Sequence, residues 1–174
     1  MRTTQKIAVT AAAAVLVGAA GGGAAAASSP SAATTAKGSE AAPSSCRPAN
    51  HTAKLTAGPA TSGYHHYRVT LIAAPGYAPC RLAGSPTDVR FYHHGVPTGV
   101  TALRYGPQHT VVNFGPGHPV HFDIQVPHSA AGAPADETAF TLKTPDGVIP
   151  GESTAYGRLT VDAGTAIGPV RPGA

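Results

Sequence analysis

The chain has 174 residues, of which only 11% are charged, and 21 glycines and 17 prolines interrupt it at short intervals. This composition disfavours long helices and favours short strands joined by turns. The formal net charge is +4, but no cluster of Lys or Arg could follow a phosphate backbone, so we expect no nucleic-acid partner.

The first 27 residues have the features of a signal peptide. Arg2 and Lys6 give a basic start, an apolar run follows, and Ala25–Ala27 provide small side chains before a cleavage site at Ser28. Removing this leader lowers the formal net charge from +4 to +2. We therefore predict a secreted or cell-wall-associated protein without a membrane span. A retained transmembrane anchor is the alternative, although Gly21–Gly23 dilute the apolar run.

Three segments follow the leader. Residues 28–45 are small and polar, which predicts a flexible stalk, because such a segment cannot bury enough apolar surface to fold. Residues 46–169 suffice for one domain with a single core, and residues 170–174 are predicted to be a tail. The sequence does not indicate an oligomeric state.

The predicted strands are short and lie between turns that contain Gly or Pro. They cover residues 54–57, 67–73, 88–92, 101–105, 109–114, 120–126, 138–143 and 155–162. Residues 120–126 form the clearest strand, because four apolar side chains alternate with His121, Asp123 and Gln125 at the two-residue period of a strand. We expect the apolar row to face the core and His121 and Asp123 to lie on the solvated face. Residues 129–136 are expected to form a loop.

Seven or eight short strands without a helical pattern predict an all-β fold. The alternation argues for sheets with one buried face, so we predict an antiparallel β-sandwich, with a partly open barrel as the second arrangement. The side chains expected in its core are those of Tyr67, Val69, Leu71, Ala73, Val89, Phe91, Leu103, Val112, Phe114, Val120, Phe122, Ile124, Val126, Phe140, Leu142, Leu159 and Val161.

The chain has two cysteines, Cys46 and Cys80. In an exported protein we expect them to form one disulfide bond, because oxidising compartments allow such bonds to persist. The bond would close a loop of about 35 residues, worth roughly 3 to 4 kcal/mol in the chain-entropy model. The spacing shows neither a C-x-x-C pair nor a neighbouring base, so a reactive thiol is not predicted.

Nine histidines make a metal site worth testing. Adjacent residues of a strand point to opposite faces, so a His-His doublet can hold one ion only where it lies in a loop. His93 and His94 precede Gly95 in an expected turn, and His121 shares a strand face with Asp123. These four residues are the candidate ligands of a site assembled across strands. The alternative is that they are solvated turn and strand-face residues.

No catalytic motif or cofactor fingerprint occurs in the sequence. The segment Gly151–Ala155 approaches a nucleophile elbow at Ser153 but lacks the final glycine and a following helix, so we interpret it as a loop. Asp136 and Glu137 lie in a predicted loop, and no sequence signal places a partner carboxylate at working distance. We therefore predict no cofactor and no enzymatic activity.

One pattern resembles a secreted bacterial family called domain of unknown function 4232. It consists of a strand, a turn with glycine, Cys, Leu, Gly-x-Pro and a second strand, carried here by Val69, Leu71, Gly76, Cys80, Leu82, Gly84, Pro86, Val89 and Phe91. The segment Phe114–Gly117 before Val120 is similar to the Pro-Gly turn of that family. The resemblance covers residues 46–169 and implies an exported or surface-anchored protein of high-GC Gram-positive bacteria, an immunoglobulin-like sandwich and no established activity.

Two functional hypotheses follow. The leading one is a non-enzymatic secreted or envelope-associated module that binds or scaffolds an unknown envelope or extracellular ligand. Its grounds are the leader, the stalk and the strand pattern. The alternative is a small extracellular metal-dependent enzyme or metal-binding protein that uses a cross-strand histidine site.

Overall fold

The computed structural model describes residues 42–128 and 131–174, and these residues form β-strands joined by turns. The predicted leader and most of the predicted stalk lie outside the described residues. A single turn of 3-10 helix, η1 (Pro48–Asn50), precedes the strands. The strands are β1 (His51–Ala57), β2 (Tyr64–Ala73), β3 (Cys80–Ala83), β4 (Thr87–His93), β5 (Val96–Pro97), β6 (Leu103–Arg104), β7 (Val111–Phe114), β8 (Val120–Pro127), β9 (Ala133–Thr141), β10 (Lys143–Thr144), β11 (Gly147–Val148), β12 (Ser153–Val161), β13 (Ala166–Ile167) and β14 (Arg171–Pro172). The all-β prediction is confirmed.

The main sheet is mixed. Its strand order is β5-β4-β9-β12-β1-β2-β8-β13-β6, with β14 paired to β8. Most neighbours are antiparallel, but β1 pairs with β12 in parallel and β13 pairs with β6 in parallel. The prediction of an entirely antiparallel arrangement is therefore wrong. Parallel neighbours need a long connection, and nearly 100 residues separate β1 from β12.

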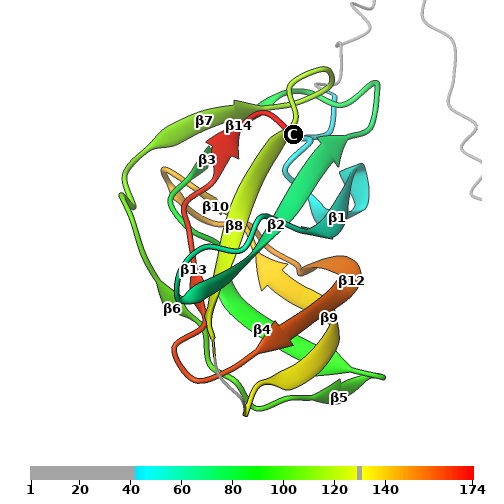
Figure 1. The fold of residues 1–174 in the computed structure, drawn as a ribbon. Coiled ribbons are helices and arrows are strands. Elements are labelled where there is room, and N and C mark those ends of the chain that lie inside the picture. The colour runs from blue at the N-terminus through cyan, green and yellow to red at the C-terminus, as the bar shows by residue number, and fades with distance from the viewer. Residues whose placement is uncertain (1–41, 129–130) are drawn as a thin grey trace, which may run out of the picture. The chain divides into compact units, whose positions relative to one another are not determined.

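The sheet curls so that its two halves face each other, in the manner of a half-barrel. Figure 1 shows β2 and β8 side by side in one half and β4, β9 and β12 in the other, with β1 paired to both halves. The alternating apolar rows of β2 and β8 lie inside the curl, where Val69 of β2 is paired with Phe122 of β8. Phe122 in turn contacts Phe140 of β9. The core therefore lies between the two halves.

Two small sheets complete the unit. In one, β3 pairs with β7, and in the other, β10 pairs with β11. The predicted disulfide bond joins Cys46 to Cys80, with 5.9 Å between the Cα atoms, and so attaches the segment before β1 to β3. Strand β3 was not predicted, because it has only four residues before Gly84 and Leu82 is its one clear buried apolar position.

The predicted core is correct at most positions. Leu103 is the main error, because its side chain is 59% exposed. It lies in β6, which is two residues long and ends the main sheet, so no further strand covers it. Val89 is only partly buried, next to a register shift between Thr87 and Arg90 in the pairing of β4 with β9.

The predicted loop of residues 129–136 is wrong for residues 133–136, which belong to a strand. Strand β9 begins at Ala133, and Pro134 is paired with Thr160 of β12. The prediction gave weight to Pro and Ala as loop formers, but proline is tolerated at the start of a strand.

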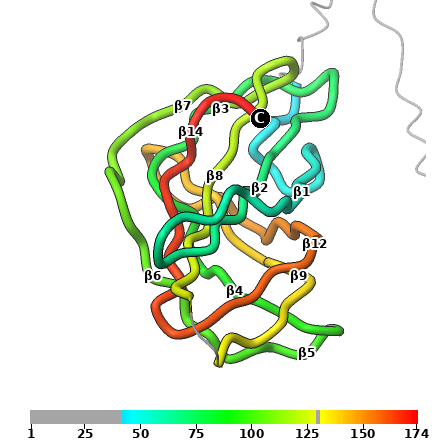
Figure 2. Tube along the Cα trace, viewed as in Figure 1, coloured from blue at the N-terminus to red at the C-terminus, as the bar shows by residue number. Residues whose placement is uncertain are grey.

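Both ends of the predicted domain also need correction. Pro43 and Ser45 exchange backbone hydrogen bonds with Ala78, so the folded unit begins before Cys46. At the other end, residues 170–174 are not a free tail. Val170 is buried, and Arg171 and Pro172 of β14 pair with His121 and Val120. Figure 2 shows this last segment, in red, running along β8.

Among the described residues, no helix has the length and apolar character needed to cross a membrane.

Candidate metal centre

A tight turn joins β4 to β5 and carries two adjacent histidines. His93 is the last residue of β4 and is paired with Val96, the first residue of β5. His94 and Gly95 form the turn with φ values of 50° and 77°. Positive φ at both central residues is typical of a type I′ hairpin turn, and glycine adopts it without steric cost. The turn brings His94 back towards His93, so the two rings meet instead of pointing to opposite faces.

Asp136 of β9 reaches the same turn. Tyr92 is paired with Glu137, and continuing this antiparallel register by one residue places Asp136 opposite His93. Oδ2 of Asp136 lies 3.3 Å from Nδ1 of His93 and 3.4 Å from Nδ1 of His94. The two imidazole rings have centroids 4.1 Å apart and are tilted by 44°. The three potential ligand atoms all lie within 4.8 Å of one another.

The backbone of the turn holds the carboxylate in place. The N–H of His94 donates to Oδ1 of Asp136 at 3.2 Å and to Oδ2 at 3.1 Å. Asp136 is thus attached to the same residue whose ring it approaches. The side chains of His94, His93 and Asp136 are 80%, 42% and 35% exposed, so the cluster is open to solvent on one side.

One atom of the cluster is enclosed. Nδ1 of His93 is shielded from solvent and forms no hydrogen bond, although Oδ2 of Asp136 is 3.3 Å away. Buried polar nitrogens nearly always have a partner, and an orphaned one calls for an explanation. The His93 side chain as a whole is 42% exposed, so this buried nitrogen lies close to the solvent-facing side of the cluster.

The structure separates the four ligand candidates of the sequence into two groups. His93 and His94 lie together in the predicted turn. His121 and Asp123 of β8 are not part of this cluster: Nδ1 of His121 is 3.0 Å from the carbonyl oxygen of Gly173, and Asp123 forms an ion pair of 3.0 Å with Arg68. His121 is 8% exposed, so its expected place on a solvated face is wrong. The last residues of the chain cover it.

Asp136 was missed as a ligand. The sequence drew attention to Asp136 and Glu137, but as a possible carboxylate pair in a loop. Its partnership with His93 depends on how β4 and β9 are paired, and residues 43 positions apart in sequence give no local signal of their register.

A second histidine contact lies inside the domain. Nδ1 of His51 is 3.0 Å from the carbonyl oxygen of Ser45, and Nε2 is 2.9 Å from Oγ of Ser153. A carbonyl oxygen can only accept, so Nδ1 carries the proton and the hydroxyl of Ser153 donates to Nε2. Burial lowers the pKa of His51, while hydrogen bonds to the backbone of Ser45 and Arg47 act in the opposite direction.

This Ser-His contact matches the polarity of a hydrolase dyad, but its surroundings favour a structural role. His51 is 9% exposed, Ser153 is 5% exposed, and the imidazole meets the edge of Phe114 at a centroid distance of 5.6 Å. Ser153 was predicted to lie in a loop, but it is the first residue of β12. The contact joins the start of β1 to the start of β12 and satisfies buried polar atoms.

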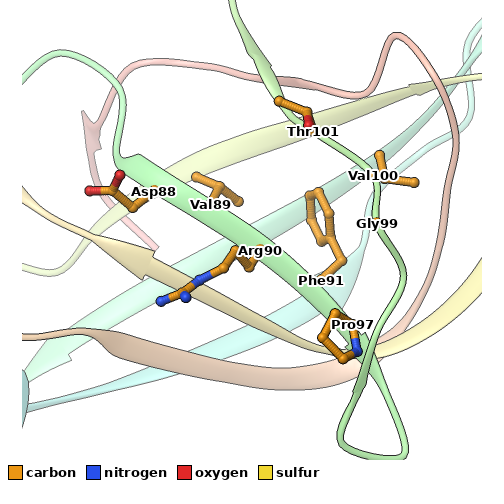
Figure 3. Close-up of a pocket in the computed structure, with 8 residues that line it drawn as sticks. All are labelled: Asp88, Val89, Arg90, Phe91, Pro97, Gly99, Val100 and Thr101. Atoms are coloured by element: carbon orange, nitrogen blue, oxygen red, sulfur yellow. The ribbon is translucent and has the colours of Figure 1, made fainter.

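A groove of about 510 Å³ lies beside β4, between that strand and residues 97–101. Figure 3 shows Phe91 directed towards Val100 and Thr101, while Arg90 extends away from them. The guanidinium group of Arg90 forms an ion pair with Glu152, the residue before β12. The groove therefore lacks the convergent polar groups that a specific small-molecule site needs.

Comparisons of the chain with models of protein families, with curated proteins and with solved structures found no match. The assignment of a site consequently depends on the geometry of the His93, His94 and Asp136 cluster.

Proposed function

We propose that the chain is an exported, non-enzymatic binding module that acts at the cell envelope or outside the cell. The observation that carries this proposal is the disulfide bond between Cys46 and Cys80. Such bonds persist in oxidising compartments and are rare in the cytosol. The leader-like first 27 residues supply the route to such a compartment, and the stalk-like residues 28–41 supply a spacer.

The binding surface that we assign is the β4–β5 turn together with the start of β9. Both elements belong to a sheet whose strands are tied by backbone hydrogen bonds, and they present exposed polar side chains at its edge. Recognition groups are commonly placed on turns that a rigid scaffold positions. The side chain of His94 is more exposed than those of His93 and Asp136.

We also propose that the domain is an immunoglobulin-like sandwich of the domain of unknown function 4232 type. Support comes from the facing halves of the sheet, which pack through Phe122 and Phe140, and from β1, which is shared by both halves. The residues that carry the family resemblance lie close together, because Cys80 and Leu82 form β3 directly after β2 and Gly84 leads into β4.

Cell fractionation with intact-mass analysis tests the proposed function. The producing cells should hold the protein in the envelope or culture medium, with a mass that begins at Ser28 and includes one disulfide bond. A control chain that lacks residues 2–27 should stay in the cytosol. Retention of the full-length chain in the cytosol with an intact leader and two free thiols would contradict the proposal.

A further inference from the structure

We propose that His93, His94 and Asp136 bind one divalent transition-metal ion, for which Zn²⁺ is the best match. This inference names a ligand for the surface assigned above, and its biological meaning rests on the proposed function. The binding itself does not depend on export, so the two proposals can fail separately.

The spacing of the ligand atoms agrees with tetrahedral coordination. Zn²⁺ binds histidine nitrogen and carboxylate oxygen at about 2.0 to 2.2 Å, which puts two ligand atoms of a tetrahedron about 3.3 to 3.5 Å apart. The distances from Oδ2 of Asp136 to the two Nδ1 atoms are 3.3 Å and 3.4 Å. One nitrogen from each ring and one carboxylate oxygen of Asp136 lie within 4.8 Å of one another. Small side-chain rotations are therefore enough to complete the site.

Two features indicate that the site is organised before an ion arrives. The carboxylate of Asp136 is fixed by the backbone N–H of His94, and a ligand that is oriented in advance loses little freedom on binding. Nδ1 of His93 is buried without a hydrogen bond. An ion at this point would bind the unpaired nitrogen of His93. It would also bind the carboxylate of Asp136 and the ring of His94.

The ligand set selects the class of ion. Two imidazole nitrogens and one carboxylate oxygen suit Zn²⁺, Cu²⁺ or Ni²⁺, whereas Ca²⁺ and Mg²⁺ prefer sites made of oxygen. Within residues 42–128 and 131–174, no further His, Cys, Asp or Glu joins the three-membered cluster. The fourth position is thus left to water or to a donor from another molecule, on the side where His94 is exposed.

Calorimetric titration of the metal-stripped protein with ZnCl₂ tests the proposal. We expect one Zn²⁺ per chain, and we expect Asp136→Asn and His93→Gln each to weaken binding by tenfold or more. His118→Gln is the matched control, because His118 is exposed and lies outside the cluster. Equal affinity in Asp136→Asn and the unchanged protein would overturn the proposal.

A competing histidine pair needs its own control. The rings of His65 and His128 have centroids 4.1 Å apart, as close as those of His93 and His94. His65→Gln should leave zinc affinity unchanged, because among the described residues no third His, Cys, Asp or Glu joins this pair in a ligand cluster. Loss of binding in His65→Gln, with binding kept in His93→Gln, would assign the ion to the other pair and overturn the proposal.

The number and type of metal-bound nitrogens can be measured on the unchanged protein, with variants needed only to assign the resonances. Long-range ¹H–¹⁵N correlation spectra identify which imidazole nitrogens bind a metal. One equivalent of Zn²⁺ should shift the Nδ1 resonances of two histidines, which His93→Gln and His94→Gln assign. Shifts of Nε2 resonances, or of a single histidine, would overturn the proposed geometry. If the protein binds zinc but is found in the cytosol, the proposed metal site stands and the proposed exported function is contradicted.

Discussion

Phe122 of β8 and Phe140 of β9 meet edge to face across the core, with ring centroids 5.0 Å apart and an angle of 75° between the rings. Both side chains are fully buried. Edge-to-face pairs of this kind add stability beyond the burial of their surface. The contact joins strands from opposite halves of the curled sheet. Its contribution to stability therefore measures how well the two halves pack against each other.

Removing one of these rings should destabilise the domain strongly. Phe122→Ala deletes a buried side chain and leaves a cavity, for which we expect a loss of about 3 to 5 kcal/mol. The chain has no tryptophan, so chemical denaturation is followed by far-UV circular dichroism to measure this loss. Phe140→Ala should cost a similar amount, and the double variant should cost less than the two losses added, because the partners touch. A loss below about 1 kcal/mol would mean that the halves do not pack as described.

His121→Ala tests the role of the last residues of the chain. His121 is buried under β14 and is 3.0 Å from the carbonyl oxygen of Gly173, so the substitution removes one hydrogen bond worth about 0.5 to 1.5 kcal/mol. We also expect faster amide exchange at Arg171 and Gly173. Unchanged exchange in this segment, measured against Gln125→Ala on the same strand, would show that His121 does not hold the C-terminus.

Acid should weaken the fold through His51. Burial lowers the pKa of His51 in the folded state below the ordinary histidine value of about 6.5. The unfolded chain therefore binds a proton first as the pH falls, so the stabilisation is fully present above about pH 6.5 and is lost from there down to the folded pKa. The urea concentration at the midpoint of unfolding should decrease when the pH is lowered from about 7.5 to about 5. The decrease should be smaller in His51→Gln.

The pH test needs a histidine that does not change its surroundings on folding. His109 is exposed, so His109→Gln should follow the pH dependence of the unchanged protein. An equal slope in His51→Gln and the unchanged protein would assign the acid sensitivity to other groups.

Gly84 should not tolerate alanine. Its φ is 66°, and a Cβ atom there would lie 2.6 Å from the carbonyl oxygen of Gln108. Gly117 has a similar φ of 76° but open space around it, so Gly117→Ala measures the backbone strain alone, about 1 to 2 kcal/mol. We expect a larger loss in melting temperature for Gly84→Ala than for Gly117→Ala. Equal losses would show that the Gln108 segment moves aside.

The strands with strong side-chain patterns could be predicted from the sequence. In β8 the apolar residues alternate over its whole length, and all four of them are buried as expected. Strands β10, β11, β13 and β14 have two residues each, and two residues are too few to show a period. Their positions depend on neighbours that are distant in sequence. The curl and the parallel pair of β1 with β12 likewise depend on long-range pairing.

The part of the candidate site that depends on local sequence was predictable, and the part that depends on strand pairing was not. His93, His94 and Gly95 lie in the turn that their sequence suggests, because glycine after a polar residue favours a tight hairpin. Asp136 joins them through the register of β4 with β9, and His121 is excluded because β14 covers it. Both outcomes follow from tertiary pairing and not from local sequence.

The parallel pairing of β1 with β12 affects the order in which the protein can fold. Ala53 is paired with Ala155, so the strand at the middle of the sheet lacks one neighbour until nearly the whole chain has been synthesised. Contacts between residues so far apart in sequence give a high contact order and slow folding, typically milliseconds to seconds. The sheet can therefore be completed only after β12 has become available to pair with β1, late in the synthesis of the chain.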